Sequence, residues 1–559
     1  MKLVGLLLSF LTAPVRQRNL RLLLVLLAVF AFLVAVFSAL FHVLMAAEGQ
    51  EHSWATAVYW TLVTMTTLGF GDITFQSDAG RIFSVVVLLS GTLFLLILLP
   101  FTFIQFVWVP WMNKREAERV PRELPVKCAG HIVLTSAGPI EDVLIERAAR
   151  AGVSYVVLVT ELEEGLRLHD RGYRVMLGAL DDPRTYRAAR VEAAALLVAT
   201  RSDTANTNIV FTVREISAGV PIIATANAPA SVDILQLAGA GVVLQLGENL
   251  GCAMAQRILD AGSHSHTLGE IAGVCIAEAV VPRHLPVHSA AEITERTGVD
   301  VVGTWKRGEF APVSASEGLL LGAVLVLAGS PEQLASYDEL RGQGIETPGA
   351  VVVIGGGRVG RRVGASLADA GVDYRIIERR AERVRDPARY VVGDAAEIDV
   401  LNAAGMPRAA AVVITTHDDD VNVYLTIYAR RLRPDIQVIA RANLDRNVST
   451  LYRAGADAVL SYASTGAAAI WNRFRPDASL LLAEGLDVFR VAVPPSLVGR
   501  SIAGAEITEA TGCQVVAVVD DGGPARCRRE ARSAPLRGDA ELILIGDAAD
   551  QERFHRVYG

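Results

Sequence analysis

The segment TTLGFGD, which ends at Asp72, places a glycine on each side of an aromatic residue and lies between two long apolar stretches. Glycine reaches backbone angles that are closed to other residues, so an extended segment here can turn successive carbonyl oxygens to one side. A row of such oxygens can replace the water shell of a cation. The residues that this chemistry would use are Thr67, Leu68, Gly69, Phe70, Gly71 and Asp72.

A glycine motif with a different chemistry follows the strand-like segment AVVVI. Gly355, Gly357 and Gly360 have the spacing GxGxxG, and Glu378 ends the next strand-like segment, 18 residues after Gly360. In this context the glycines let a diphosphate approach a helix N-terminus, and the carboxylate accepts hydrogen bonds from ribose hydroxyls. The sequence therefore predicts a site for a nucleotide such as NAD or ADP. Further candidate contributors are Arg358, Val359, Arg379, Asp394, Ala395, Thr416 and Arg441.

The densest acidic cluster consists of Asp418, Asp419 and Asp420. Calcium binds where several oxygen ligands converge, so this cluster is a candidate calcium site. Carboxylates at the start of a helix also cap its N–H groups without any metal. Capping is the simpler explanation, and calcium is a hypothesis beside it.

Two stretches without charged residues, 22–47 and 82–113, flank the first motif. As helices that rise about 1.5 Å per residue they would be about 39 and 48 Å long, more than the ~30 Å hydrocarbon core of a bilayer. Basic residues precede the first stretch and follow the second, whereas the connection between them has Arg81 as its one Lys or Arg. The positive-inside rule predicts a multi-pass protein of the cell (inner) membrane with both termini in the cytoplasm.

The connection between the two stretches is too long for a simple turn. Its first part, residues 53–66, has the apolar content of a helix, with Ser53 as a candidate N-cap. This helix could re-enter the bilayer and leave the glycine segment at membrane depth. Non-helical backbone is tolerated there only where it lines a water-filled pathway.

In this setting TLGFGD resembles the selectivity filter TVGYG of potassium channels, with Leu68 in place of valine and Phe70 in place of tyrosine. The resemblance implies K⁺ as the permeant ion and carbonyls of residues 67–70 as its ligands. It also implies that four chains close one pore, lined by the second stretch. Gly91 in that stretch is either a hinge or a packing glycine. Phe70 lacks the tyrosine hydroxyl, which could loosen the filter.

Composition bears on partners and on redox state. The net charge is −7 without a basic tail, which does not favour a nucleic-acid partner. The five cysteines are widely spaced and all follow the second apolar stretch. We therefore expect free thiols in a reducing cytosol.

The rest of the chain contains one pattern twice, with Gly138 matching Gly357 at an offset of 219 residues. Each copy alternates strands and helices, as in a parallel sheet, and ends in a shorter mixed segment. At the three glycine positions the first copy has Ser136, Gly138 and Glu141. Because Glu141 would repel a phosphate, we expect the first copy to have lost the nucleotide site.

The repeat resembles the RCK (KTN) domain, a regulator of potassium conductance, over nearly all of residues 128–549. This resemblance implies a homotetramer whose eight RCK domains form a cytoplasmic ring, which senses a ligand and pulls on the pore through a linker. The predicted fold class is an α-helical membrane pore domain, with two spanning helices and a re-entrant pore helix, followed by two Rossmann-like α/β RCK domains with small α+β C-terminal lobes. The predicted segments are an interfacial segment (1–18), pore domain (19–111), linker (112–127), first Rossmann-like lobe (128–250), first helix with its C-terminal lobe (251–345), second Rossmann-like lobe (346–466) and second helix with its C-terminal lobe (467–559).

Two other classes of function fit part of the sequence. A membrane-anchored NAD-dependent oxidoreductase would use the GxGxxG motif, but the sequence supplies no convincing acid or base near it. A regulatory component of a potassium uptake system has tandem RCK-like domains but no pore of its own. The sequence favours a ligand-gated potassium channel rather than an enzyme.

Overall fold

The computed structural model divides the chain into two compact units, Met1–Pro121 and Arg122–Gly559. The residues that it describes are 14–109, 112, 119–259, 265–281, 285, 287–306, 309–313, 318–319, 323–341, 349–475, 479–481, 486–520, 523 and 525–559. The predicted interfacial segment, 1–18, lies mostly outside these residues. The predicted linker, 112–127, lies partly outside them.

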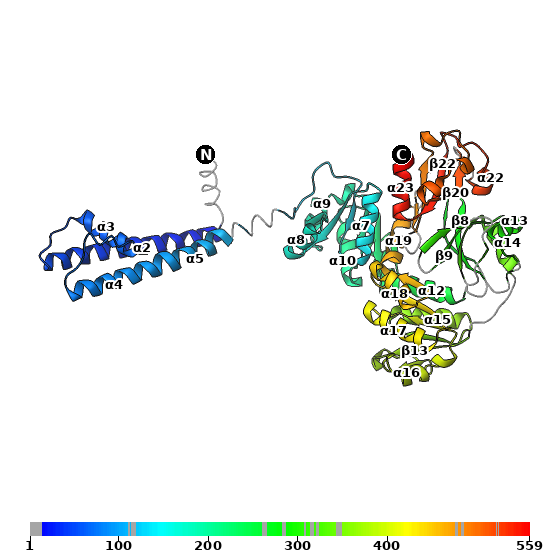
Figure 1. Ribbon diagram of the computed structural model, residues 1–559, viewed down its shortest axis with the longest axis horizontal. Coiled ribbons are helices and arrows are strands. Elements are labelled where there is room, and N and C mark those ends of the chain that lie inside the picture. Colours follow the sequence, from blue (N-terminus) through cyan, green and yellow to red (C-terminus); the bar gives the residue numbers. More distant parts are fainter. Residues whose placement is uncertain are drawn as a thin grey trace. The chain divides into compact units, whose positions relative to one another are not determined.

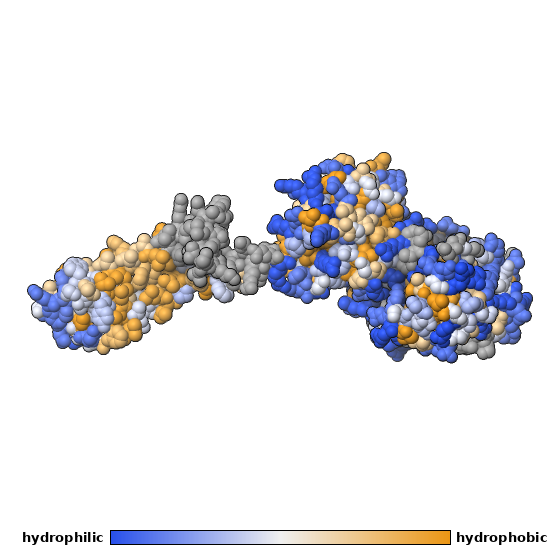
Figure 2. Space-filling view, turned by 90° about the horizontal axis from the view of Figure 1, so that it is seen from above, coloured by the Kyte–Doolittle hydropathy of each residue, from blue (hydrophilic) through white to orange (hydrophobic). Residues whose placement is uncertain are grey.

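The first unit consists of helices, as its long apolar stretches predict (Figure 1). Two are long and apolar enough to cross a membrane, over Val25–Ala47 and Asp78–Phe103, with hydropathies of 2.6 and 2.8. Figure 2 shows hydrophobic residues over much of the visible side of this unit. The elements are α2 (Pro14–Ala47), α3 (Trp54–Met65), α4 (Asp78–Thr92), the π-helical segment η1 (Leu93–Leu98), α5 (Leu99–Phe103) and the π-helical segment η2 (Ile104–Trp108).

The short helix α3 contacts both α2 and α4 and is held by buried aromatic rings. Ser53 caps it, because its side chain accepts a hydrogen bond from the N–H of Thr56. Trp60 stacks on Phe41 of α2 with ring centroids 4.8 Å apart, and it meets Phe75 edge-on at 5.3 Å. Such aromatic pairs contribute about 0.5–1.5 kcal/mol beyond the area that they bury. The rings therefore hold α3, and the loop after it, against α2.

The second candidate span changes from α-helix to π-helical turns on each side of Pro100. Proline has no N–H, and its ring crowds the carbonyl four residues earlier, so regular α-helical bonding cannot continue through it. Wide turns of this kind occur frequently at functional positions in helices. The helix therefore continues past Pro100, but with π-helical turns before and after the short α-helical segment α5.

The second unit contains the repeat as two six-stranded parallel sheets with the same strand order, third–second–first–fourth–fifth–sixth (Figure 1). Most strands are short and buried, which explains their nearly unbroken runs of Val, Ile and Leu. The first sheet contains β1 (Ile132–Leu134), β2 (Tyr155–Val159), β3 (Val175–Leu177), β4 (Leu196–Ala199), β5 (Ile222–Thr225) and β6 (Val242–Leu244). The second contains β12 (Val351–Ile354), β13 (Tyr374–Glu378), β14 (Tyr390–Val392), β15 (Ala411–Ile414), β16 (Gln437–Ala442) and β17 (Ala458–Ser461).

Helices connect the successive strands of these sheets, except that β13 and β14 are joined by a loop with the 3-10 turn η4 (Ala381–Arg383). In the first copy they are α7 (Pro139–Arg150), α8 (Leu162–Asp170), α9 (Pro183–Ala188), α10 (Asp203–Arg214) and α11 (Ala230–Leu237). In the second copy they are α15 (Arg358–Asp369), α16 (Ile398–Ala403), α17 (Asp419–Leu432) and α18 (Val448–Ala454).

The helix that leaves each sheet packs against the other copy. The helix α12 (Leu246–Leu259) of the first copy lies on α15 of the second, and α19 (Tyr462–Phe474) of the second lies on α7 of the first. A Cβ added at Gly251 would lie 2.6 Å from the Cβ of Arg362 and 2.8 Å from the carbonyl oxygen of Val359. Glycine therefore permits the close approach of α12 and α15. This exchange of helices makes the two copies one unit.

Each copy ends in a five-stranded antiparallel sheet, and the two sheets share a hydrophobic core. The first lobe contains β7 (His266–Ile271), β8 (Val274–Val280), α13 (Ala290–Thr297), β9 (Asp300–Lys306), β10 (Glu309–Pro312), β11 (Val324–Gly329) and α14 (Pro331–Arg341). The second contains β18 (Ser479–Leu481), β19 (Asp487–Ala492), α20 (Ile502–Ala505), α21 (Ile507–Thr511), β20 (Gln514–Val519), β21 (Ala525–Cys527), α22 (Arg528–Ala531), β22 (Glu541–Gly546) and α23 (Ala548–Tyr558).

A buried ion pair joins the second C-terminal lobe to the first Rossmann-like lobe. Arg147 of α7 pairs with Asp487 of β19. The guanidinium also lies over the ring of Trp471 in α19, 5.6 Å from the ring centroid. Burial lowers the pKa of Arg147 to about 10, far above the pH of the cytosol, so the side chain keeps its charge. Removing one partner of such a pair is costly because it leaves a buried charge alone.

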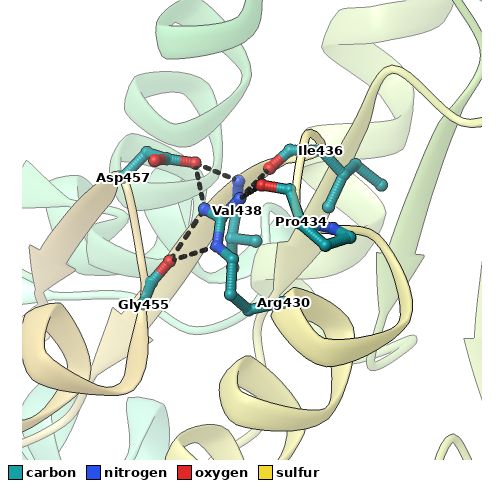
Figure 3. Close-up of polar contacts among 6 residues, drawn as sticks. All are labelled: Arg430, Pro434, Ile436, Val438, Gly455 and Asp457. Atoms are coloured by element: carbon teal, nitrogen blue, oxygen red, sulfur yellow. Dashed lines mark hydrogen bonds and ion pairs between the residues drawn. The ribbon is translucent and has the colours of Figure 1, made fainter.

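An arginine outside every motif ties the end of α17 to its neighbouring strands (Figure 3). Arg430 donates from Nε and Nη2 to the carbonyl oxygen of Gly455, at 3.0 and 2.8 Å, and pairs with Asp457 at 2.7 Å. The first copy repeats the tie, since Arg214 donates to the carbonyl of Gly239 at 2.8 Å. Figure 3 also shows that Arg430 donates to the carbonyl oxygens of Pro434 and Ile436, and that the N–H of Val438 donates to Asp457.

Candidate functional site

The loop after α3 has an alternating backbone. Thr67, Gly69 and Gly71 have φ angles of 63°, 48° and 74°, whereas Leu68 and Phe70 between them do not share this left-handed region. Threonine is β-branched and rarely adopts a positive φ, so the loop contains local strain of the kind found at functional sites. Alternation between left-handed and ordinary angles permits the carbonyls of successive residues to turn the same way. This is the backbone that the cation hypothesis requires.

The helix α3 anchors both ends of this loop, one end through two side chains and the other through a backbone carbonyl. The Tyr59 hydroxyl donates to Asp72 at 3.1 Å, and the indole N–H of Trp60 donates to the carbonyl of Ile73 at 3.1 Å. At the inner end the N–H of Leu68 donates to the carbonyl of Val63 at 3.0 Å. The Trp60 indole thus has a partner within its own chain, although Phe70 offers no hydroxyl. The loop therefore keeps support behind it without a tyrosine.

Gly91 lies where α4 crosses the end of α3. A Cβ at this position would lie 2.3 Å from Cα of Met65 and 2.4 Å from its carbonyl oxygen. Any larger residue would force the two helices apart. This contact supports the packing role that the sequence left open, and a hinge at Gly91 stays a prediction.

The three glycines of the GxGxxG motif lie between β12 and α15. Gly355 has a φ of 104°, a left-handed angle that favours glycine. A Cβ at Gly360 would lie 1.9 Å from the carbonyl oxygen of Gly355, so only glycine fits there. Gly357 is the N-cap of α15 and provides no side-chain cap, and a Cβ there would meet nothing closer than 3.9 Å. The start of α15 therefore faces open space, as a helix that receives a phosphate must.

A cavity of about 350 Å³ lies at this helix start. Glu378, at the end of β13, is buried beside it, and its carboxylate accepts hydrogen bonds from the N–H groups of Gly356 and Arg380, each at 2.9 Å. The predicted residues that line the cavity are Gly355, Gly357, Glu378, Arg379, Asp394, Ala395 and Thr416. The lining also includes Arg380, Arg383, His417 and Asp418.

Charged side chains of both signs line this cavity. Three are the arginines Arg379, Arg380 and Arg383, and three are carboxylates, Glu378, Asp394 and Asp418. The pKa of His417 lies below its ordinary value, first because the ring is buried and then because Arg441, Arg358 and Arg383 repel a further positive charge. Arginines beside a free helix N-terminus suit a diphosphate, and carboxylates suit the hydroxyl groups of a ribose. The residues present therefore fit a nucleotide.

Arg358, Val359, Gly360 and Arg441 do not line the cavity. The first three form the first turn of α15, next to the lining residues. Arg441 is buried in β16, where its guanidinium lies 4.9 Å from the ring centroid of Tyr462 and donates to the side chain of Asn443 at 2.6 Å. Burial lowers its pKa to about 10. Its role as a direct phosphate partner has no support from this position.

The acidic cluster is used within the protein. Asp418 caps α17 by accepting hydrogen bonds from the N–H groups of Asp420 and Val421. Asp419 is buried and accepts hydrogen bonds from the N–H groups of Asn443 and Leu444, at 2.7 and 3.1 Å. Within the described part of the chain, no group of three or more His, Cys, Asp or Glu side chains is placed to hold a metal. The calcium hypothesis for these aspartates therefore receives no support, because their carboxylates cap and tie backbone.

The first copy fills its own site. Glu141, at the position of Gly360, is buried at the start of α7 and accepts hydrogen bonds from the hydroxyls of Ser136 (2.9 Å) and Thr200. A Cβ at Gly138 would lie 3.0 Å from one of its oxygens. The carboxylate therefore occupies the region in which the second copy is open. This agrees with the expectation that the first copy has no equivalent nucleotide site.

Family comparisons match both parts of the chain. A profile described as "Ion channel" matches residues 24–108, and one described as "TrkA-N domain" matches residues 132–246 and 351–462. The curated relatives include "Probable potassium channel protein 2" of Methanocaldococcus jannaschii, 27% identical over 146 residues, which are 25% of this chain and 43% of that protein. The "Trk system potassium uptake protein TrkA homolog" of Pyrococcus horikoshii is 36% identical over 96 residues, 16% of this chain and 42% of that protein. The chain spans less than half the length of these curated relatives.

Solved structures extend the match along the chain. The "GsuK channel bound to NAD" is 35% identical, with a TM-score of 0.58, and the alignment covers 97% of this chain and 99% of that one. The "GsuK RCK domain" is 34% identical with the same TM-score of 0.58, over 80% of this chain and 99% of that one. The predicted fold class and the predicted resemblance are both confirmed by these matches. Because the full-length alignment exceeds 30% identity, the chain belongs to the family of the GsuK channel, potassium channels with tandem RCK domains.

Proposed function

We propose that four copies of this chain form a potassium channel whose pore is opened or closed by a nucleotide bound at the second RCK domain. The observation that carries the proposal is that one chain contains both a strained, alternating pore loop and an open GxGxxG cavity. A membrane-anchored oxidoreductase would account for the cavity but not for the loop after α3. A regulatory component of a potassium uptake system would not account for this loop either.

The proposed permeant ion is K⁺. The M. jannaschii relative is named as a potassium channel, and the profile match of residues 24–108 includes the whole loop. The carbonyls of Thr67, Leu68, Gly69 and Phe70 would coordinate the ion. Both termini would lie in the cytoplasm, as the basic flanks of the two spans favour. We further propose that the pore domain extends over 19–111 and the linker over 112–127.

The proposed tetramer is supported by apolar side chains that a single chain leaves uncovered. Leu68 and Phe70, in the pore loop, are 63% and 65% exposed. In the second RCK domain, Val421, Tyr424 and Ile427 form an exposed apolar stripe along α17. Uncovered apolar groups of this size are typical of interfaces. A fourfold arrangement would bring the pore loops together around one axis.

The proposed ligand is an adenine nucleotide with a diphosphate, NAD or ADP. One solved relative is described as bound to NAD. The cavity offers a free helix N-terminus for the diphosphate and a buried Glu378 whose remaining lone pairs suit ribose hydroxyls. The chain would act on this ligand only by binding it, and catalysis is not part of the proposal.

The exchanged helices offer a route from the ligand to the pore. The start of α15 borders the cavity, and α15 packs on α12 of the first copy through Gly251. Leu124 lies in the linker, earlier in the chain than the first RCK domain, and its N–H donates to the carbonyl of Ala188 at 3.0 Å. This hydrogen bond ties the end of the linker to that domain. A nucleotide that binds one arrangement of these helices better would shift the population of open pores.

The test is K⁺ flux through the purified protein in liposomes, with and without NAD⁺, NADH, ADP and Ca²⁺. The matched variant is Gly357→Asp, which adds a carboxylate at the helix start, where an added Cβ would have 3.9 Å of space, and so should repel a phosphate. We expect a nucleotide to change flux in the wild type and to have no effect in the variant. An equal nucleotide response in both proteins would refute the assignment of the site, and absence of K⁺ flux would refute the channel.

A further inference from the structure

A second cavity, of about 290 Å³, lies between the two C-terminal lobes and is not part of the glycine-motif site. The first lobe contributes α13 and the start of β9, and the second lobe contributes α22. One part of the lining is apolar and is formed by Ala290, Val301 and Val313. The second lobe contributes three arginines, Arg528, Arg529 and Arg532. The cavity therefore offers a charged side and an apolar side to one occupant.

The arginines of this cavity differ in their contacts. The backbone N–H of Arg529 donates to Asp300 at 3.3 Å, and its guanidinium donates to the carbonyl of Thr294 at 3.1 Å, so Arg529 bridges the two lobes. Among the described residues, the side chains of Arg528 and Arg532 make no hydrogen bond and no close ion pair, and the nearest carboxylates that act on Arg528 are those of Asp300 and Glu509. Two guanidinium groups beside the same cavity thus keep their N–H donors for a ligand.

The two arginines differ in burial, since Arg528 is partly buried and Arg532 is exposed. Burial lowers the pKa of Arg528, although Asp300 and Glu509 oppose the shift. Arg532 lies one turn further and repels it. A partly buried cation without a close carboxylate is stabilised by an anion, and an anion in the cavity would provide this for Arg528. Guanidinium groups present two parallel N–H donors that match phosphate oxygens.

We propose that this cavity binds a small organic phosphate, with its phosphate oxygens between Arg528 and Arg532 and its apolar part against Ala290, Val301 and Val313. Glu295 and Asp300, which also line the cavity, would accept hydrogen bonds from hydroxyl or amino groups of the ligand. Because the walls come from both lobes, a bound ligand stabilises their present arrangement. The site is a second ligand input to the RCK domains, separate from the glycine motif.

The test is isothermal titration calorimetry, in which pyrophosphate is titrated into the full-length protein. The protein carries Gly357→Asp, so that the glycine-motif site does not contribute. We expect saturable binding that weakens at least about tenfold in the double variant Arg528→Gln/Arg532→Gln, because charge-assisted hydrogen bonds are lost. The matched control is Arg537→Gln, an exposed arginine of the same lobe that pairs with Asp539, and it should bind as before.

A second variant covers the case in which the double variant fails to fold. Ala291→Glu adds a carboxylate at an exposed helical position of the lining, and it should weaken pyrophosphate binding by repulsion. The proposal is overturned if the starting protein shows no saturable binding. It is also overturned if a folded Arg528→Gln/Arg532→Gln or Ala291→Glu protein binds pyrophosphate as tightly as the control. Neither result bears on nucleotide binding at Gly357.

Discussion

At the scale of single residues, the glycines of the GxGxxG motif have different roles. A Cβ at Gly360 would lie 1.9 Å from a carbonyl oxygen, whereas a Cβ at Gly357 would have 3.9 Å of space. We expect Gly360→Ala to destabilise the second Rossmann-like lobe by about 1–3 kcal/mol, because overpacking forces the backbone to move. Gly357→Ala should change the free energy of unfolding by no more than about 0.5 kcal/mol. Thermal unfolding of the two variants measures the difference, and equal losses would contradict these roles.

Glu141 provides a pH-dependent prediction. Burial raises the pKa of this carboxyl above its ordinary value of 4.5, although hydrogen bonds from Thr200 and Ser136 oppose the shift. A raised pKa means that the folded state binds the proton more tightly, so stability is lost as the pH rises from the unfolded-state pKa through the folded-state pKa. We expect Glu141→Gln to remove this loss. Unfolding of wild type and variant between about pH 5 and pH 8 checks it, and parallel pH curves would contradict it.

The cavity residues show how far sequence can predict a site. Gly355, Gly357 and Glu378 follow from local order, because strand, turn, helix and strand bring them together within one βαβ unit. Arg383 and His417 also line the cavity, but they come from two different strand connections, after β13 and after β15, that no spacing rule relates. Arg441 has the right charge and lies near, yet its side chain turns to Tyr462. The direction of a side chain from a buried strand depends on tertiary packing, which the sequence motif does not contain.

At the scale of elements, the sequence predicts the repeat of strands and helices. It does not predict whether α12 and α19, the helices that leave the two parallel sheets, pack on their own copy or on the other one. The apolar faces of α12 and α19 suit a partner of either copy, and only tertiary packing selects the exchanged arrangement. The same limit applies to α3, whose place against α2 depends on the stacking of Trp60 on Phe41. The spacing of apolar residues predicts whether an element is a helix or a strand. Which other element it packs against depends on how the side chains of the two surfaces fit together.

The contact between α12 and α15 makes the coupling route testable. A Cβ at Gly251 would lie 2.6 Å from its neighbour, whereas a Cβ at Gly247 in the same helix would meet Arg358 at an ordinary 3.5 Å. We expect Gly251→Val to separate the helices, so that the nucleotide still binds while its effect on K⁺ flux falls severalfold. Gly247→Ala is the matched control and should keep the response. Nucleotide affinity by calorimetry and flux in liposomes are measured on the same preparations, and an unchanged flux response in Gly251→Val would exclude this route.

At the scale of the whole molecule, the apolar stripe on α17 connects assembly to ligand binding. Val421, Tyr424 and Ile427 are 41%, 54% and 52% exposed, and Val421 also lines the nucleotide cavity. A neighbouring chain on this stripe would therefore contact the edge of the ligand site. Such an arrangement would let a nucleotide change how chains meet, as ring gating requires.

Charges on the stripe should weaken the proposed tetramer. We expect Tyr424→Glu/Ile427→Glu to lower the mass of the detergent-solubilised protein in light scattering or to make it dissociate on dilution, because buried carboxylates without partners oppose association. Val557→Glu, at a 51% exposed apolar position of α23 in the second C-terminal lobe, is the control and should stay tetrameric. If the stripe variant remains a tetramer whose flux still responds to nucleotide, α17 faces solvent in the assembly. The ligand must then act through the exchanged helices alone.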